Sequence, residues 1–402
     1  MLRMPTPRTT RHAPLAGVRI IDFSRVLTGP YATRLFAEMG ADVIKIESPE
    51  GDLTRRIAPK HDRGMSGLYT YANVGKRNIC IDLCIPEGTE LALDLVRTAH
   101  AVVENFRPGV AERLGVGWDA VHRVNPRAVM LSISGFGHDS SWRERGAFAP
   151  TIHAATGLLE YQARATGQPL TRLGDARADM TTALHGAVAL LAALRSAEAT
   201  GEGERIELAM YDAVLATYSE TPFELLDEPA PRTEAAPFNA GPNGWITVAG
   251  PPQYCWALMT RAFPELEDPT PAGADLPTKT RLRHEAMESW MSVQPSTEVL
   301  LKRLDDAGLP CAPIATLTEA LAGSFAQERE LLLTLDDRRG GRRTVVRSPY
   351  RFSRSECHVR GPAPRRGEHN TEVLRELLGH DDERIRELEA SGVLSAAPTD
   401  ES

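Results

Sequence analysis

The first half of the chain alternates short apolar segments with segments of helical spacing, and this pattern constrains the fold more than any other feature. The apolar segments span residues 18–23, 42–47, 78–83, 101–106 and 128–134. Such alternation predicts a parallel β-sheet with helices on both faces. Because ligands of these sheets bind beyond the carboxyl ends of the strands, we expect a site in the loops that follow these segments.

Helical spacing connects the predicted strands. Residues 31–39 form one predicted helix, and residues 86–98 form another that has Pro86 in its first turn, where proline is favoured. Beyond the middle of the chain, residues 205–210 are a further predicted strand, and a helix begins at Tyr211.

The length of 402 residues is too great for one small core and favours two domains. A stretch rich in Pro, Glu and Ala is typical of a linker between them. The predicted segments are a disordered basic extension (1–14), a large α/β domain of Rossmann-like type (15–226), the linker (227–237), a smaller α+β domain (238–330) and a segment that returns to strand and ends in helices (331–402).

Composition and charge argue against several classes of protein. Hydrophobic residues make up 42% of the chain, and no apolar run approaches the ~20 residues of a membrane span, so we expect no membrane contact. The net charge of −8 argues against nucleic acid as a partner. The odd number of cysteines indicates a reducing compartment, and we expect the cytoplasm. Cys80 and Cys84 lack the further ligands that a metal site would need.

Several common catalytic motifs are absent from the sequence. The chain has no Gly-x-x-x-x-Gly-Lys-Ser/Thr loop, and no Gly-x-Gly-x-x-Gly follows the first predicted strand. His-Glu-x-x-His and Gly-x-Ser-x-Gly are also absent. These absences argue against a P-loop nucleotide enzyme, a dinucleotide enzyme, a zincin and a serine hydrolase.

Asp179 directly precedes an almost uncharged helix that is predicted from Ala183 to Leu194. The positive end of a helix dipole keeps a nearby carboxylate ionised, and an ionised aspartate in a cleft can attack an acyl group. The alternative is an N-cap, in which the side chain accepts hydrogen bonds from the first free N–H groups of the helix. This segment alone leaves both interpretations open.

Basic residues collect at the predicted strand ends and in nearby loops, where Arg and Lys suit the oxygens of phosphates. Together with apolar neighbours they could hold the phosphates and the adenine or pantetheine arm of coenzyme A. The candidate contacts are the basic residues Arg25, Lys76, Arg77, Arg107 and Arg113, the apolar residues Leu27 and Phe106, and their loop neighbours Val26, Asn105 and Ser134.

An ordered set of segments resembles the class III coenzyme A-transferases, the family that includes the formyl-CoA, carnitine-CoA and succinyl-CoA transferases and the α-methylacyl-CoA racemases. The segments keep the family's order from about residue 15 to 395. They are Leu15-Ala-Gly-Val-Arg-Ile-Ile-Asp, Thr28-Gly-Pro, Gly40-Ala-Asp-Val-Ile-Lys-Ile-Glu, Asn73-Val-Gly-Lys-Arg-Asn-Ile-Cys-Ile-Asp-Leu, Val103-Glu-Asn-Phe-Arg-Pro-Gly, Ser134-Gly-Phe-Gly, Gly174 with Asp179-Met, Thr200-Gly-Glu-Gly-Glu, Ala307-Gly-Leu-Pro-Cys-Ala-Pro, Gly361-Pro-Ala-Pro and Gly367-Glu-His.

The resemblance implies a function and an architecture. It implies a CoA-transferase that moves coenzyme A from an acyl-CoA to a carboxylic acid, with Asp179 as the catalytic residue that forms an aspartyl anhydride and then an aspartyl-CoA thioester. Coenzyme A is then a substrate, and no permanently bound cofactor is implied. The resemblance also implies an interlocked, ring-like homodimer in which residues 331–402 complete the large domain.

Departures from the family pattern keep alternatives open. The racemases of the family carry a histidine where Phe148 aligns, which leaves His153 as an outside candidate for the second acid/base of a racemase or isomerase. The linker has few of the glycines that cover the aspartyl intermediate in many transferases, so a non-catalytic CoA-binding homologue is a third alternative. Asp175 lies four residues before Asp179, and its negative charge would raise the pKa of Asp179 if the two carboxylates were close. We expect the side chain of Asp175 to point away.

The sequence does not identify the two acids that would exchange coenzyme A. A basic residue for the second carboxylate of a dicarboxylic acid could be Arg143, Arg145 or Arg164, and the sequence does not discriminate among them.

Overall fold

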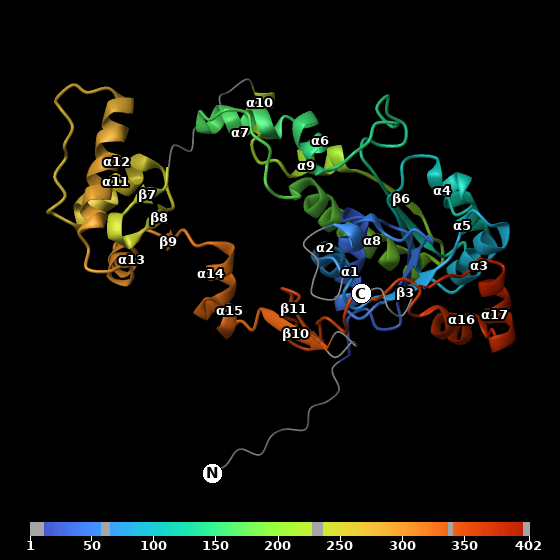
Figure 1. The fold of residues 1–402 in the computed structure, drawn as a ribbon. Coiled ribbons are helices and arrows are strands. Elements are labelled where there is room, and N and C mark those ends of the chain that lie inside the picture. The colour runs from blue at the N-terminus through green and yellow to red at the C-terminus, as the bar shows by residue number, and fades with distance from the viewer. Residues whose placement is uncertain (1–11, 58–64, 227–235, 337–340, 397–402) are drawn as a thin grey trace, which may run out of the picture. The chain divides into compact units, whose positions relative to one another are not determined.

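Six parallel strands in the order β3-β2-β1-β4-β5-β6 form the central sheet, and its edge strands β3 and β6 are labelled in Figure 1. The computed structural model describes residues 12–57, 65–226, 236–336 and 341–396. The strands are β1 (Arg19–Asp22), β2 (Asp42–Glu47), β3 (Arg77–Cys80), β4 (Ala101–Glu104), β5 (Val129–Ser134) and β6 (Arg205–Ala209). The predicted parallel α/β sheet is therefore confirmed, with each strand within a few residues of its predicted position.

Two units compose the chain. The larger unit contains residues 1–159, 172–219 and 330–402, and the smaller contains 160–171 and 220–329. The predicted linker 227–237 lies mostly outside the described residues, as does most of the predicted extension 1–14.

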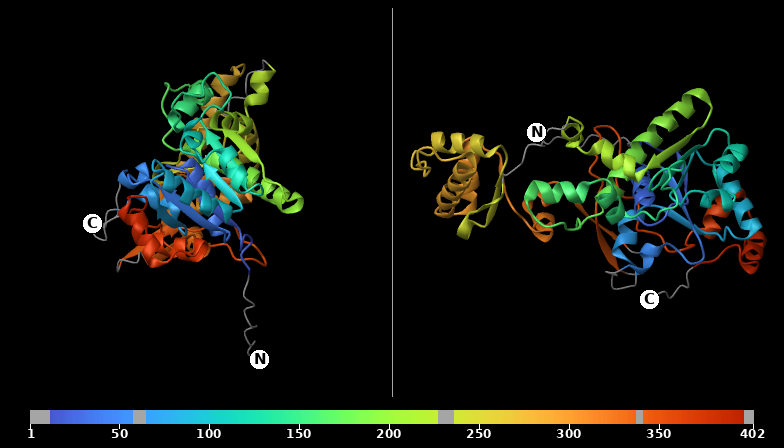
Figure 2. Two further views of the ribbon diagram at one scale, coloured as in Figure 1. Left: turned by 90° about the vertical axis from the view of Figure 1, so that its right-hand side faces the viewer. Right: turned by 90° about the horizontal axis from the view of Figure 1, so that it is seen from above.

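Helices cover both faces of the sheet in the larger unit (Figure 2). Ile21 and Val102 belong to a core shared with one set of helices, while their neighbours Ile20 and Val103 belong to the core on the other face. This alternation follows from the period of two along a strand. The first set is α3 (Pro86–Arg97), α4 (Val110–Arg113), α5 (Trp118–Val124), α16 (Asn370–Leu378) and α17 (Asp382–Ala390), and the second is α1 (Thr28–Glu38), α6 (Ala149–Ala155), α8 (Arg177–Thr200) and α9 (Met210–Thr217).

Helix α8 is long and apolar enough to cross a membrane by length and composition alone, which the sequence analysis did not anticipate. One side of it packs against α1 and β5. Gly186 faces the sheet so closely that an added Cβ would lie 3.1 Å from a methyl carbon of Leu131. Part of the apolar composition of α8 therefore serves its packing on the sheet, while Leu184, Val188 and Leu191 on the same helix stay exposed.

The C-terminal segment returns to the larger unit and covers the edge strand β3. In Figures 1 and 2 the red helices α16 and α17 lie beside the blue and cyan N-terminal elements. The backbone N–H of Asn78 donates to His369 Nδ1 at 3.1 Å, and that of Cys80 donates to Asn370 Oδ1 at 2.9 Å. These bonds satisfy edge groups that would otherwise be open to another strand.

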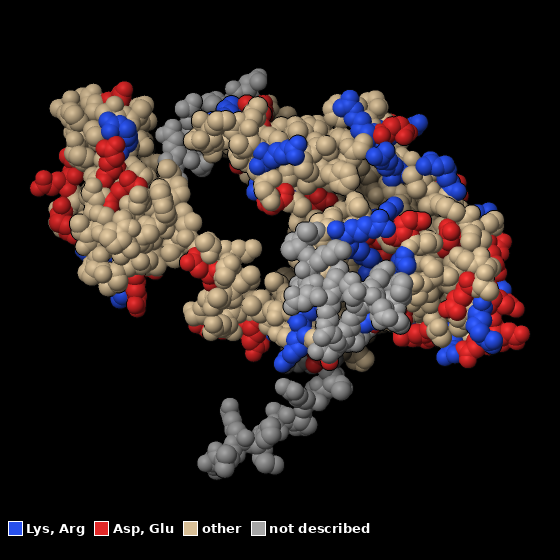
Figure 3. Space-filling view, viewed as in Figure 1, with Lys and Arg blue, Asp and Glu red and all other residues tan. Residues whose placement is uncertain are grey.

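The remaining elements complete the two units. In the larger unit these are η1 (Leu53–Arg56), α2 (Gly67–Asn73) and the antiparallel pair β10 (Leu332–Asp336) and β11 (Arg342–Val346). Helix α7 (Leu158–Thr166) begins in the larger unit and continues into the smaller one. The smaller unit packs helices on a three-stranded antiparallel sheet, with α10 (Thr221–Leu225), β7 (Phe238–Asn239), η2 (Gly241–Asn243), β8 (Trp245–Val248), α11 (Pro252–Ala262), α12 (Leu276–Ser292), α13 (Thr297–Asp306), β9 (Cys311–Pro313), α14 (Leu317–Ala322) and α15 (Ser324–Glu328). On the side of the molecule that Figure 3 shows, acidic and basic side chains are interspersed among other residues.

Candidate active site

A cavity of about 400 Å³ lies where the strand order reverses, between the carboxyl ends of β1 and β4. This switch point is where open α/β sheets bind ligands. The cavity is lined by Arg25, Val26, Leu27, Thr28, Leu53, Asn105, Phe106, Arg107, Pro108, Val110, Ile133, Ser134, Gly135, Arg143, Arg145, Ala147, Phe148, Asp179 and Met210. It thus brings together Asp179 and seven of the ten candidate contacts for coenzyme A.

The loops after β1 and β4 are tied together by one side chain. Asn105 Oδ1 accepts from the backbone N–H of Arg25 at 2.7 Å, and its Nδ2 donates to the Arg25 carbonyl oxygen at 2.8 Å. An added Cβ at Gly29 would lie 2.3 Å from the Cβ of Ser24, so only glycine permits this close approach at the start of α1. The result is a tightly folded wall on the β1 side of the cavity.

Val26 in this wall has a left-handed backbone, with φ of +67°. A β-branched residue rarely adopts this conformation, and the strain costs about 1–3 kcal/mol, which the surrounding structure must offset. The carboxylate of Asp52 accepts from the Val26 N–H at 3.2 and 3.3 Å. Asp52 therefore holds the loop in its strained shape, with Val26 and Leu27 lining the cavity.

Lys76 lies beneath this wall and outside the cavity, because its fully buried ammonium forms an ion pair with Asp22 at 3.0 Å. It also donates to the Pro30 carbonyl oxygen at 2.8 Å. Burial lowers the pKa of Lys76 to about 8, against the opposing effect of Asp22. The expected phosphate contact does not fit this position, and Lys76 instead braces the loop between β1 and α1.

Lys45 and Asp52 form a second buried pair at 3.1 Å, and Lys45 also donates to the Ser24 carbonyl oxygen at 2.7 Å. Burial alone would raise the pKa of Asp22, but Lys76 and Lys45 outweigh it and lower that pKa. Two buried lysines and two buried aspartates therefore stabilise residues 24–28 from below.

Two further candidate contacts also lie outside the residues that line the cavity. Arg77 pairs with Asp42 at 2.6 Å and with Glu376 at 2.7 Å, so its guanidinium ties β3 to β2 and α16. Arg113 ends α4 and is not among the residues that line the cavity. The sequence placed both residues near strand ends, and the partners of Arg77 become visible only in the fold.

Asp179 lies in the first turn of α8 and is not its N-cap, which is Ala176. One carboxylate oxygen of Asp179, Oδ1, accepts from the Thr28 hydroxyl at 2.5 Å. Burial raises the pKa of Asp179 above its usual value, although the hydrogen bond from the Thr28 hydroxyl opposes this shift. The N-cap interpretation is therefore wrong, and the carboxylate faces the cavity.

His153 is a buried cap of α8, since its Nε2 accepts from the backbone N–H of Ala178 at 3.0 Å. Burial lowers the pKa of His153, which favours the neutral ring that this bond requires. Asp175 lies on the surface beside Arg177 and does not line the cavity. Thus His153 positions the helix that carries Asp179, and Asp175 lies apart from the cavity.

Glu104 ends β4 directly below the cavity and is almost fully buried. Its Oε2 accepts from the backbone N–H of Phe106 at 2.8 Å and so fixes the turn that carries Asn105 to Arg107. Burial raises the pKa of Glu104 to about 7. This role could not be predicted, because the apolar segment 101–106 marked Glu104 only as one residue of a strand.

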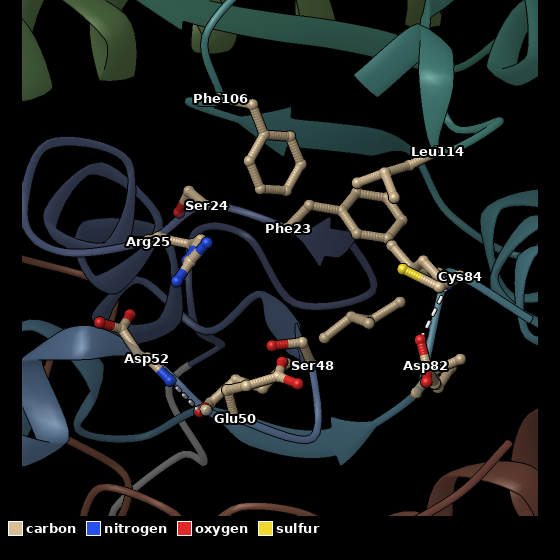
Figure 4. A pocket seen from close by; sticks show the side chains of 15 residues that line it. Phe23, Ser24, Arg25, Ser48, Glu50, Asp52, Asp82, Cys84, Phe106 and Leu114 are labelled. Atoms are coloured by element: carbon tan, nitrogen blue, oxygen red, sulfur yellow. Dashed lines mark hydrogen bonds between the residues drawn. The ribbon is translucent and has the colours of Figure 1, made fainter. Parts of the chain in front are cut away.

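A second cavity of about 170 Å³ adjoins the first, and Arg25 and Phe106 line both (Figure 4). The rings of Phe23 and Phe106 lie across it from Ser48 and Glu50 (Figure 4). Its lining combines apolar side chains, among them Phe23 and Phe106, with polar residues that include the acids Glu47, Glu50, Asp52 and Asp82. The two cavities together offer space for an elongated ligand.

Arginines dominate the charge of the larger cavity. Among the described residues that line it, four are arginines (Arg25, Arg107, Arg143 and Arg145), and Asp179 is the one acid. Arg143 and Arg145 belong to an exposed segment after β5, where Arg145 lies 3.9 Å from the ring centre of Trp142. Arg164, the third candidate for a substrate carboxylate, pairs with Glu160 and Glu224 in the smaller unit.

Thr28 is the functional residue that the sequence analysis missed. The motif Thr28-Gly-Pro was recognised, but its hydroxyl had no assigned partner because Asp179 is 151 residues away. A hydroxyl residue at the start of the helix that follows the first strand is the signal that could have indicated it. Among the described residues, no cluster of His, Cys, Asp and Glu has the arrangement of a metal site.

The chain was compared with known protein families and with curated proteins. Residues 15–370 match the model of CoA-transferase family III. The chain is 34% identical to formyl-CoA:oxalate CoA-transferase of Streptomyces coelicolor, over 94% of this chain and 99% of that protein. It is 31% identical to the succinyl-CoA–L-malate CoA-transferase beta subunit of Chloroflexus aurantiacus, over 96% of this chain and 99% of that protein.

Solved structures with the same fold cover nearly the whole chain. A CAIB/BAIF family protein from Brucella suis aligns with a TM-score of 0.75 and 27% identity, over 91% of this chain and 100% of that one. The protein Rv3272 from Mycobacterium tuberculosis aligns with a TM-score of 0.75 and 25% identity, over the same shares of the two chains.

Proposed function

This chain belongs to CoA-transferase family III and is an enzyme that moves coenzyme A between an acyl-CoA and an acid, and we propose that Asp179 is its nucleophile. The observation that carries this proposal is the position of Asp179, the one acid among the described residues that line the cavity at the switch point of the sheet. Four arginines line the same cavity, in a place suited to anionic substrates.

The proposed reaction has four acyl-transfer steps. They involve three carbonyl carbons, which belong to the donor acyl group, to Asp179 and to the acceptor acyl group. The Asp179 carboxylate attacks the thioester carbon of the donor, the C–S bond breaks, and coenzyme A leaves as a thiolate from the resulting anhydride. The thiolate attacks the aspartyl carbon, and the donor acid leaves as a carboxylate. The acceptor carboxylate then attacks the aspartyl-CoA thioester and displaces the thiolate, which attacks the acceptor acyl carbon and frees Asp179. Each step replaces a difficult direct exchange with an easier one.

We propose that coenzyme A extends through both cavities. The apolar cavity with Phe23 and Phe106 suits the adenine ring, and the larger cavity leads the pantetheine arm to Asp179. Arg25 and Arg107 lie at the larger cavity, where guanidinium groups can hold phosphate oxygens. In this arrangement the thioester meets the carboxylate that the Thr28 hydroxyl contacts.

We propose a dicarboxylic acid as the acceptor class. The relatives' names include oxalate and malate, which carry a second carboxylate. The exposed guanidinium groups of Arg143 and Arg145 line the same cavity as Asp179 and can bind such a group.

We propose a homodimer in a reducing, cytoplasmic environment. On α8, Leu184, Val188 and Leu191 expose 46%, 68% and 37% of their surfaces at spacings of four and three residues, which form one apolar stripe. A second copy of the chain would bury this stripe, and the family resemblance implies a homodimer. All five cysteines are unpaired, in keeping with a reducing compartment.

Racemisation receives less support than transfer. A racemase needs a second acid/base that can deliver a proton to the substrate, and His153 was the outside candidate. Its Nε2 already accepts from the Ala178 N–H, and its side chain is buried beneath α8. Neither Phe148 nor His153 therefore supplies that group.

The Asp179→Asn variant tests the nucleophile. We expect transfer to fall by about 10⁴-fold or more, because an amide cannot form the anhydride, while the Kd for coenzyme A measured by calorimetry stays within a few-fold. A variant that keeps normal transfer rates would show that Asp179 is not the nucleophile. A variant that retains normal binding and deuterium exchange at the acyl α-carbon would point to proton transfer.

A further inference from the structure

We propose that Thr28 is a catalytic residue whose hydroxyl stabilises the oxyanion that forms on the Asp179 carbonyl oxygen. This inference rests on the proposed role of Asp179 and concerns how attack at its carbonyl carbon is accelerated.

The contact between the two side chains is short and well supported. The Thr28 hydroxyl donates to Asp179 Oδ1 at 2.5 Å, and both residues line the larger cavity. Thr28 begins α1 and is only 3% exposed, so its side chain has little freedom. The loop that precedes it is held by the buried pairs of Lys45 with Asp52 and of Lys76 with Asp22. The donor is therefore fixed in place before the substrate binds.

The bond to Thr28 makes the two oxygens of Asp179 inequivalent. The oxygen that attacks the donor acyl carbon becomes the bridging atom of the anhydride, and the other oxygen remains the aspartyl carbonyl oxygen. Because a hydrogen bond lowers the nucleophilicity of the oxygen that accepts it, the oxygen bonded to Thr28 is the one that stays as the carbonyl. The hydroxyl then already contacts this oxygen in the anhydride and in the thioester.

Two of the four transfers take place at the Asp179 carbon. When the thiolate attacks the anhydride there, and when the acceptor carboxylate attacks the thioester there, the negative charge appears on the oxygen that Thr28 contacts. A fixed donor aimed at the place where charge develops is the arrangement of an oxyanion hole. In the other two transfers the charge appears on the substrate's acyl oxygen, which is a different atom.

The test is the half-reaction with an acyl-CoA and no acceptor. Covalent CoA on the Asp179 peptide is followed by rapid quench and mass spectrometry in the unmodified enzyme and in Thr28→Val, which keeps the shape and removes the hydroxyl. We expect the Thr28→Val rate to fall by about 10²- to 10³-fold, the cost of one oxyanion-hole donor. Thr28→Ser, which keeps the hydroxyl, should recover most of the rate.

A matched control uses the same substitution on the helix that carries Asp179. Thr182 is buried one turn later in α8, and its hydroxyl donates to the Ala178 carbonyl oxygen at 2.7 Å without contacting Asp179. Thr182→Val should therefore leave the half-reaction within a few-fold of normal. The Kd for coenzyme A should stay within a few-fold in both valine variants, because a purely structural defect would weaken binding as well.

The outcomes separate this proposal from the one on which it rests. Adduct formation on Asp179 at the same rate in the unmodified enzyme and in Thr28→Val would overturn the role of Thr28 and leave the nucleophile assignment intact. If the unmodified enzyme transfers coenzyme A without any Asp179 adduct, the nucleophile assignment itself fails. A slow Thr28→Val half-reaction with an equally slow Thr28→Ser would also overturn the role of the hydroxyl.

Discussion

The two walls of the larger cavity differ in how firmly they are held. Residues 24–28 rest on buried ion pairs, and Val26 keeps a strained backbone there. The other wall, formed by Arg143, Arg145, Ala147 and Phe148, belongs to a largely exposed segment, and 55% of the surface of Phe148 is accessible. Thr28, which needs a fixed geometry in the proposed chemistry, therefore lies on the wall that the buried ion pairs support. Arg143 and Arg145, which we propose to bind the acceptor acid, lie on the exposed wall, where a substitution should cost little stability.

Removal of the buried ion pair between Lys76 and Asp22 should have the largest effect. Lys76→Met leaves Asp22 as a buried carboxylate without its partner at 3.0 Å. We expect the free energy of unfolding to fall by about 3–5 kcal/mol in urea titrations, the usual cost of a broken buried pair. As a control, Arg143→Ala on the exposed wall should change it by no more than about 0.5 kcal/mol. Equal stability of Lys76→Met and the unmodified enzyme would remove the distinction between the walls.

Phe106 lies at the junction of the two cavities, so its loss should be the next largest effect. Phe106→Ala removes apolar contact with coenzyme A, and we expect its Kd to rise by roughly 10- to 100-fold, from the ~1.5–3 kcal/mol of a buried apolar side chain. Calorimetry with coenzyme A would measure this. Phe325, 69% exposed in the smaller unit, supplies a control substitution that should leave the Kd unchanged. An unaltered Kd in Phe106→Ala would place coenzyme A elsewhere.

The exposed wall should control the choice of acid. For Arg145→Ala we expect the KM for a dicarboxylate acceptor to rise about tenfold, the effect of losing ~1.4 kcal/mol of binding, with little change for a monocarboxylate. Arg164→Ala is the matched control, since Arg164 pairs with Glu160 and Glu224 in the smaller unit. If Arg145→Ala raises only the KM for acyl-CoA, its guanidinium binds coenzyme A and not the acid.

The smallest effect concerns the cost of placing the catalytic carboxylate in the cavity. Because burial raises the pKa of Asp179 in the folded protein, its ionisation destabilises the fold as the pH rises from the usual aspartate range through the raised value. Asp179→Asn should therefore be slightly more stable than the unmodified enzyme at pH 7, and this difference should vanish in acid. Thermal unfolding at both pH values would measure it, and a variant less stable at pH 7 would contradict it.

Most of the fold could be predicted from the sequence, because strands and helices have local periodicities that the chain displays directly. The loops after β1 and β4 also line a cavity beyond the carboxyl ends of these strands, as the strand pattern predicted. What the sequence could not give were partners far apart in the chain. Lys76 and Asp22 are 54 residues apart, and Thr28 and Asp179 are 151 apart. A lysine at a strand end has the same local pattern whether it meets a phosphate or a buried carboxylate.

His153 is a residue whose role was suggested by its type and is changed by its position in the fold. Its residue type suggested acid/base chemistry, whereas its position under α8 makes it a hydrogen-bond acceptor for the Ala178 N–H. Only the tertiary arrangement of α6 and α8 distinguishes these two roles.

The mass of the enzyme after incubation with acyl-CoA donors, followed by mapping of the modified peptide, tests most directly whether Asp179 is the nucleophile. We expect a covalent acyl or CoA adduct on the peptide that contains Asp179, and its loss when an acceptor acid is added. Turnover in the same samples without any adduct, together with an active Asp179→Asn variant, would contradict this role of Asp179.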